Sequence, residues 1–192
     1  MLADRPSLRA LKDGTRDLHA LAERYVHILG QDATVSDYVR YLRAMYGYHA
    51  PLDPQLAQLY PDQDRGKAHL LAIDLAALGE PGPHPVCDEL PALASMPERL
   101  GAAYVTEGST LGGRYILAKL PPALAPLRGQ ATAFLSGYGT ATGTRWREFG
   151  EIVERELACS ATVEAAVEGA RDTFRKLVVW LSRHERRMAV AS

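Results

Sequence analysis

The amino-acid sequence predicts an all-α fold, a helical bundle formed by a single domain, and three observations support this prediction. Apolar residues recur at the three- and four-residue spacing of amphipathic helices along most of the 192 residues. The pattern contains no convincing pair of alternating strands. Gly and Pro separate the periodic segments in short clusters, without a linker, repeat or low-complexity tract. We therefore expect residues 1–192 to form one domain of roughly seven or eight helices.

The first three helices are expected before residue 80. Ser7 is a suitable N-cap for the first helix, because a serine hydroxyl can accept a hydrogen bond from the first helical turn. Gly30 and Gly79 end the first and the third helix, since glycine is common just after a helix. The expected spans are 8–29, then from residue 37 to a kink at Pro51 and on through 52–59, and finally 67–78.

The later part of the chain contains a glycine-rich run, Gly108-Ser109-Thr110-Leu111-Gly112-Gly113, inside one long helical pattern. Each glycine in a helix interior costs about 0.8–1 kcal/mol relative to alanine. Such a run indicates bending or a close backbone approach, so we expect a kinked helix that accommodates a flat ligand. A helix–turn–helix connection or a tight helix crossing would show the same pattern. The expected spans are 97–120, 123–135, 144–157 and 162–187, after a proline-rich loop at 80–85.

Composition and charge exclude several classes of function. The formal net charge of −1 argues against nucleic-acid binding as the main task. The sequence has no apolar run long enough to span a membrane and no signal-peptide pattern at its N-terminus. Cys87 and Cys159 share no motif spacing, so we expect free thiols in a reducing compartment, by default the cytoplasm.

Known catalytic motifs are absent, but His19 has informative neighbours. The sequence lacks Glu-x-x-His, His-Glu-x-x-His, Gly-x-Ser-x-Gly and the phosphate-binding glycine loop. On a helix, Glu23 lies one turn after His19, where its carboxylate can fix the imidazole as a metal ligand. Lys12 lies two turns before, about 10 Å along the same face, where it could meet an anionic group. An ordinary exposed set of charged residues would show the same spacing.

Two segments together resemble one family. Residues 11–23, Leu-Lys-Asp-Gly-Thr-Arg-Asp-Leu-His-Ala-Leu-Ala-Glu, resemble the proximal helix of heme oxygenases, and the run 108–113 is similar to their kinked, glycine-rich distal helix. Tyr138-Gly139, the Arg145-Trp146-Arg147 stretch and the last helix around Phe174 resemble the C-terminal half of that family. The form Glu-Gly-Ser-Thr-Leu-Gly-Gly is most similar to the bacterial, phytochrome-associated branch.

The resemblance implies a heme oxygenase that opens heme to biliverdin and releases iron and carbon monoxide. It implies heme as both cofactor and substrate, dioxygen as co-substrate, and a ferredoxin or reductase as electron donor. A bacteriophytochrome that receives biliverdin is a further expected partner. The implied site comprises the iron ligand His19, its partner Glu23, Lys12 on one propionate, Arg145 or Arg147 on the other, the distal residues Gly108, Ser109, Gly112 and Gly113, and the further heme contacts Tyr138 and Phe174. Phe174 is equally compatible with a core aromatic residue.

Ser109 departs from the family pattern. Many members carry an aspartate just after the first distal glycine, where it organises the water that protonates bound oxygen. A serine can hold a water but supplies no negative charge. This difference motivates an alternative, a non-catalytic heme-binding or heme-trafficking protein of the same fold. A thiaminase-like hydrolase is a third reading of the bundle, and it would need Cys87 or Cys159 as a pocket nucleophile.

Overall fold

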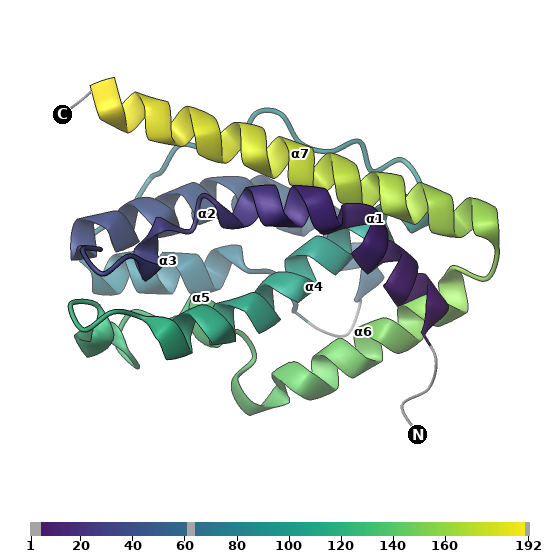
Figure 1. Ribbon diagram of the computed structural model, residues 1–192, viewed down its shortest axis with the longest axis horizontal. Helices are drawn as coiled ribbons and strands as arrows, with labels where there is room; N and C mark the ends of the chain where they lie inside the picture. The colour runs from purple at the N-terminus through teal and green to yellow at the C-terminus, as the bar shows by residue number, and fades with distance from the viewer. Residues whose placement is uncertain (1–4, 61–63, 191–192) are drawn as a thin grey trace.

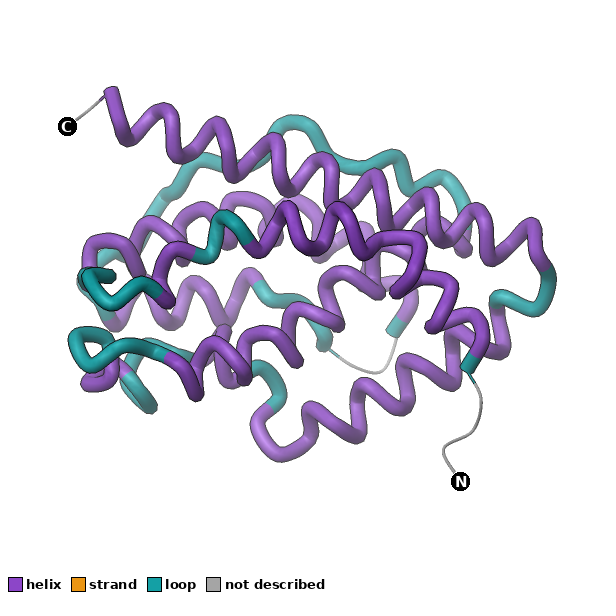
Figure 2. Tube along the Cα trace, viewed as in Figure 1, coloured by secondary structure: helices purple, strands orange, loops and turns teal. Residues whose placement is uncertain are grey.

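The computed structural model describes residues 5–60 and 64–190, with side chains as far as residue 185. All regular elements within these ranges are helices, as expected, and they form a bundle (Figures 1 and 2). The α-helices are α1 (Pro6–Glu23), α2 (Val35–Leu56), α3 (Ala68–Ala77), α4 (Met96–Lys119), α5 (Ala133–Ser136), α6 (Thr142–Glu156) and α7 (Ser160–Val190). Four single 3-10 turns join them: η1 (His27–Leu29), η2 (Ala57–Leu59), η3 (Ala125–Leu127) and η4 (Gly139–Ala141). None of the helices described is long and apolar enough to cross a bilayer.

The long helix α7 is the main support of the bundle, because both α4 and α1 pack along it (Figure 1). Gly101 of α4 lies directly against the backbone of Ala166 and Ala170 in α7. In the same contact, a Cβ atom on Gly169 would lie 2.5 Å from the carbonyl oxygen of Glu98. Since these positions have no room for a side chain, the first half of α4 and the first half of α7 are in backbone contact.

The start of α1 differs from the prediction. The helix begins at Pro6, one residue before the expected N-cap Ser7, whose hydroxyl instead donates to the Leu157 carbonyl at 3.3 Å. Proline suits a first helical position because its missing N–H needs no partner there. The Glu154 carboxylate of α6 accepts the backbone N–H groups of Ser7 (3.3 Å) and Leu8 (3.0 Å). A distant carboxylate therefore takes the place of a local cap.

The expected helix over residues 123–135 is also wrong. Only η3 and the four-residue α5 form in this segment. Gly129 adopts a left-handed backbone with φ of 77°, which ends any continuous helix. The buried Asp74 carboxylate of α3 accepts the backbone N–H groups of Ala133 (2.7 Å) and Phe134 (2.9 Å), which sets the start of α5. Burial raises the pKa of Asp74, and the two backbone hydrogen bonds oppose that shift.

The other boundaries agree with the prediction within a few residues, apart from the end of the first helix. That helix stops at Glu23 instead of residue 29, and η1 follows it. The helix α4 starts with a capping box, in which Ser95 and Glu98 bond each other's backbone N–H groups. It then runs as one uninterrupted α-helix through Gly108, Gly112 and Gly113. The glycine run therefore does not break the helix.

Candidate functional site

His19 is an exposed imidazole with two fixed neighbours. Its Nδ1 atom lies 3.5 Å from the Glu23 carboxylate one turn later on α1, and the side chain is 59% exposed. The ring of Phe174 from α7 meets the imidazole edge-on, with a centroid distance of 5.6 Å. Because Glu23 lies at Nδ1, Nε2 is the ring nitrogen left for an external ligand. The predicted histidine–carboxylate pair is therefore present in the structure.

The helices α1 and α4 meet one turn before His19. Tyr104 on α4 lies beside the buried Thr15 on α1, whose hydroxyl donates to the Leu11 carbonyl at 2.7 Å. Burial raises the pKa of Tyr104, and the neighbouring polar side chain of Thr15 partly opposes the shift. The two helices run in the same general direction and diverge toward their C-terminal ends (Figure 1). His19 and Gly108 each lie four residues, or one turn, beyond their helix's contact residue.

The glycines of the run fall into two groups. A Cβ atom on Gly108 or Gly112 would meet nothing within 4 Å, so both positions face open space. Gly113 differs, since a Cβ atom there would lie 3.0 Å from the Leu135 carbonyl oxygen of α5. Gly113 therefore packs against α5, and its predicted heme contact stays a prediction. Gly108 and Gly112 stand one turn apart on the same face of α4, where a ligand could approach the backbone.

Two exposed apolar side chains extend this open face. Leu111 is 40% exposed and Tyr115 is 63% exposed. With Gly108 and Gly112 they follow the spacing of residues on one helical face. An exposed apolar stripe beside bare backbone is typical of a surface that a flat, apolar ligand covers.

The hydroxyl of Ser109 faces its own helix. It donates to the Thr106 carbonyl at 2.7 Å, and Thr110 donates in the same way to the Glu107 carbonyl at 2.6 Å. The hydroxyl proton of Ser109 is thus engaged within α4, and the oxygen can still accept a hydrogen bond. Lys12 is exposed on α1, two turns before His19 on the same face, as the sequence predicts.

Three other predicted heme contacts are engaged elsewhere. The Tyr138 hydroxyl bonds Glu107 and Lys67 in the interior, and the Arg145 guanidinium lies 4.7 Å from the centroid of the Tyr138 ring. Arg147 is exposed and donates to Thr144 within α6. The structure therefore does not bring these residues together with His19. The assignment of Arg145 or Arg147 to a heme propionate, and of Tyr138 to a heme contact, stays a prediction.

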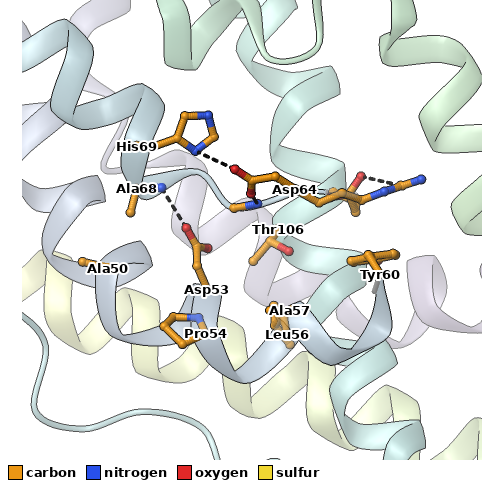
Figure 3. Close-up of a pocket in the computed structure, with 13 residues that line it drawn as sticks. Ala50, Asp53, Pro54, Leu56, Ala57, Tyr60, Asp64, Ala68, His69 and Thr106 are labelled. Carbon is orange, nitrogen blue, oxygen red and sulfur yellow. Dashed lines mark hydrogen bonds and ion pairs between the residues drawn. The ribbon is translucent and has the colours of Figure 1, made fainter. Parts of the chain in front are cut away.

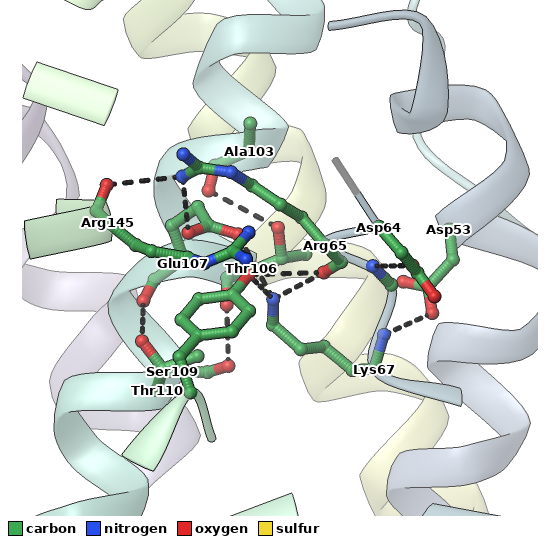
Figure 4. Close-up of polar contacts among 12 residues, drawn as sticks. Asp53, Asp64, Arg65, Lys67, Ala103, Thr106, Glu107, Ser109, Thr110 and Arg145 are labelled. Atoms are coloured by element: carbon green, nitrogen blue, oxygen red, sulfur yellow. Dashed lines mark hydrogen bonds and ion pairs between the residues drawn. The ribbon is translucent and has the colours of Figure 1, made fainter. Parts of the chain in front are cut away.

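The sequence interpretation missed a buried ionic cluster, which comprises Arg65, Lys67, Glu107 and Tyr138 (Figure 4). One Glu107 carboxylate oxygen accepts from Lys67 Nζ at 3.0 Å and from the Tyr138 hydroxyl at 2.7 Å. The other accepts from Arg65 at 3.2 Å. Burial lowers the pKa of Lys67, while the negative charge of Glu107 opposes this shift. The adjacency of Glu107 to Gly108 is the one sequence signal that could have drawn attention to it.

A cavity of about 600 Å³ lies between α2, α3 and α4 (Figure 3). Asp53 stands in its wall and accepts the backbone N–H groups of Lys67 (2.6 Å) and Ala68 (2.7 Å) at the start of α3. Thr106 and Glu107 contribute the α4 side. None of the residues predicted for the heme site lines this cavity, so it is distinct from the open glycine face.

Neither cysteine lines the cavity, as the nucleophile of a thiaminase-like hydrolase would. Cys87 is buried in the loop between α3 and α4, and burial raises the pKa of its thiol, which disfavours the thiolate. Cys159 is exposed just before α7, and a hydrogen bond with Thr162 lowers its pKa. Among the residues that the structure describes, no group of three or more His, Cys, Asp or Glu side chains could hold a metal ion.

Comparisons with known proteins identify the family. The profile of the family described as "Heme oxygenase" matches residues 83–183, just over half of the chain. A heme oxygenase from Xanthomonas campestris pv. campestris is 32% identical over 140 residues, which cover 70% of this chain and 80% of that protein. The chain belongs to the heme oxygenase family. Heme oxygenase PigA of Pseudomonas aeruginosa is 27% identical over 168 residues, covering 84% of each chain.

A solved heme oxygenase structure has the same fold. The NO- and CO-bound heme oxygenase from Neisseria meningitidis superposes with a TM-score of 0.73. The alignment covers 93% of this chain and 91% of the other, at 22% sequence identity. The heme oxygenase fold predicted from the sequence is thus confirmed. The match to the family profile begins after α1, so the assignment of His19 rests on its own geometry.

Proposed function

We propose that this chain is a heme oxygenase that binds heme between α1 and α4 and opens the ring to biliverdin. The observation that carries this proposal is the pairing of His19 with Glu23 on α1, one turn beyond the Thr15–Tyr104 contact with α4. The bare backbone of Gly108 lies one turn beyond the same contact on α4. Family membership supports the same reaction.

The residues present fit heme on both sides. On α1, Glu23 at Nδ1 orients the imidazole and leaves Nε2 of His19 to bind the iron. On α4, Gly108 and Gly112 add no side chain to the open face, so a planar ring can approach the backbone. Lys12 would hold a propionate at the exposed edge.

Bound heme would supply the iron that activates dioxygen and the ring that is oxidised. The protein's part is orientation and exclusion of water. Phe174 packs against the His19 ring and restricts its rotation. The apolar surface around Leu111 would keep water from a bound ring, and Gly108 and Gly112 would leave room for it against the backbone.

A spectroscopic titration followed by turnover tests this function. Hemin added to the purified protein should give the absorption spectrum of histidine-bound heme at one equivalent. Ferredoxin or a reductase with its electron source should then convert this spectrum to that of biliverdin in air. Stable heme that never opens would support the non-catalytic heme-binding alternative, and failure to bind hemin would refute both functions.

The same proposal extends to the cellular setting. Electrons would come from a ferredoxin or reductase in the cytoplasm, and the biliverdin released would supply a bacteriophytochrome. The form of the distal segment supports this part of the proposal, since Glu107 to Gly113 is most similar to the phytochrome-associated branch. Transfer of biliverdin to an apo-bacteriophytochrome, followed by its red absorbance, measures this step.

A further inference from the structure

Three ionisable side chains are buried together around Glu107, the residue that precedes the glycine run. Glu107, Arg65 and Lys67 are 2%, 3% and 1% exposed. Charged side chains are almost never buried so completely unless they are paired, and removing one partner leaves an uncompensated charge. Both oxygens of Glu107 are used, one by Arg65 and the other by Lys67 and Tyr138.

The cluster joins α4 to three other parts of the molecule (Figure 4). Arg65 and Lys67 come from the segment that leads into α3, and Tyr138 comes from the connection between α5 and α6. Arg65 continues the network to α6, where it donates to the Arg145 carbonyl at 3.1 Å and to Glu148 at 2.9 Å. A single carboxylate on α4 is thus held from several directions.

The residues that follow Glu107 make no comparable polar attachment to other elements, although Gly113 packs against α5. The run from Gly108 to Gly113 contains no charged side chain, and the hydroxyls of Ser109 and Thr110 bond carbonyls of α4 itself. Gly108 and Gly112 contribute no side chain at all. Packing of Gly113 against α5 holds the far end of this segment, and the attachment at Glu107 is the polar contact that sets its rotation at the start of the run.

We propose that Glu107 is a positioning residue, which Lys67 and Tyr138 hold so that α4 presents Gly108 and Gly112 to the porphyrin. On an α-helix consecutive residues are 100° apart, so a fixed Glu107 side chain fixes the direction in which Gly108 faces. Glu107 itself acts through the backbone and need not touch heme. This inference rests on the proposed heme oxygenase function.

Two substitutions loosen the cluster from opposite sides. Tyr138→Phe deletes one hydroxyl but keeps the ring on which Arg145 and Lys67 lie. Lys67→Met removes the buried ammonium group and keeps an unbranched side chain. Lys176→Met is the matched control, since Lys176 on α7 forms an ion pair with Glu89 at 3.6 Å, in a different part of the molecule. Cooperative thermal melts and helical circular dichroism establish which variants fold.

The readouts are hemin affinity, the C–O stretching frequency of the CO complex of reduced bound heme, the biliverdin isomer distribution and the turnover rate. Hemin affinity and the histidine-bound spectrum should change less than about threefold in each variant, because His19 is untouched. The C–O stretch should shift and the biliverdin isomers should become mixed in Tyr138→Phe and Lys67→Met.

Turnover should fall about ten- to a hundredfold in these two variants, while Lys176→Met should match the unmodified protein in every readout. The double variant should lose no more than the stronger single variant, because both substitutions act on one unit.

Hydrogen exchange of the heme-free protein gives a second measurement. Amides of residues 108–113 should exchange faster in both cluster variants and not in the control. The inference would be overturned by a folded Tyr138→Phe protein whose C–O stretch and isomer distribution equal those of the unmodified protein. A large loss of hemin affinity in Tyr138→Phe alone would also overturn it, because Tyr138 would then be a heme contact. Failure of the unmodified protein to bind or open heme would instead refute the proposed function.

Discussion

At the scale of single residues, His19 differs from the other exposed histidines in what surrounds it. His69 has a carboxylate partner too, since Asp64 lies 3.7 Å from its Nδ1 atom, and its side chain is 51% exposed. His69 lies in α3, outside the two helices α1 and α4 that form the proposed heme site. His19 adds the ring contact with Phe174 and a position one turn beyond the meeting point of α1 and α4. The pair His69–Asp64 is therefore a natural control.

Replacement of His19 by alanine should remove the iron ligand. Glu23 orients the imidazole, and loss of such an outer partner typically costs 10- to 100-fold in affinity or activity. We expect His19→Ala to lose the histidine-bound spectrum and to lower turnover by more than about a hundredfold. His69→Ala should retain both. Equal behaviour of the two variants in a hemin titration would contradict the assignment of His19.

The same residues show how far sequence reasoning reaches. His19 and Glu23 were predictable as a pair because they lie one turn apart on one helix, so local geometry alone brings them together. Glu107, Lys67 and Tyr138 were not, because their contact depends on how three distant segments pack. No local pattern in the sequence specifies such packing.

At the scale of elements, α4 combines two kinds of glycine. Gly112 faces open space, where a methyl group would meet no neighbour, whereas Gly113 lies against the Leu135 backbone. Sequence alone could not separate them, since both occupy the interior of one helix and differ only in which neighbour covers them. The short α5 that covers Gly113 was itself missed, because its start is set by Asp74 from α3.

Alanine substitutions should therefore have opposite effects on stability at these adjacent positions. Gly112→Ala should raise the free energy of unfolding of the heme-free protein by up to about 1 kcal/mol, from better helix propensity. It should also weaken hemin binding, because the added methyl group enters the open face. Gly113→Ala should lower the free energy of unfolding by about 1–3 kcal/mol through overpacking against α5. Chemical denaturation measures both free energies of unfolding. Stabilisation by Gly113→Ala would show that α5 shifts to accommodate the added methyl group without a net cost.

At the scale of the whole molecule, the helical class and most helix boundaries followed from periodicity and from proline and glycine signals. The bundle is organised around α7, against which α1 and α4 both pack. The two walls of the proposed heme site therefore share one support and diverge toward their C-terminal ends (Figure 1). A ligand that bridges the walls should stabilise the entire fold.

Heme should therefore raise the melting temperature of this protein substantially. A ligand at a hundred times its dissociation constant adds about 2.7 kcal/mol to the free energy of unfolding. For a chain of this size, that corresponds to about 5–10 °C. A metal-free porphyrin, which fits the same slot but cannot bind the His19 nitrogen, should give a smaller increase. Equal increases with both compounds in thermal melts would indicate that the iron–histidine bond contributes little.

The backbone contact between α4 and α7 also limits how the protein can diversify. Gly101 lies against Ala166 and Ala170, and Gly169 lies against Glu98, so no side chain can be added at either glycine without forcing the helices apart. The spacing of these two helices is consequently fixed for any relative that keeps this contact. Variation in the size of an accepted tetrapyrrole must then come from side chains on α1 or at the open positions Gly108 and Gly112 of α4. Searches for altered substrate range should start with substitutions there.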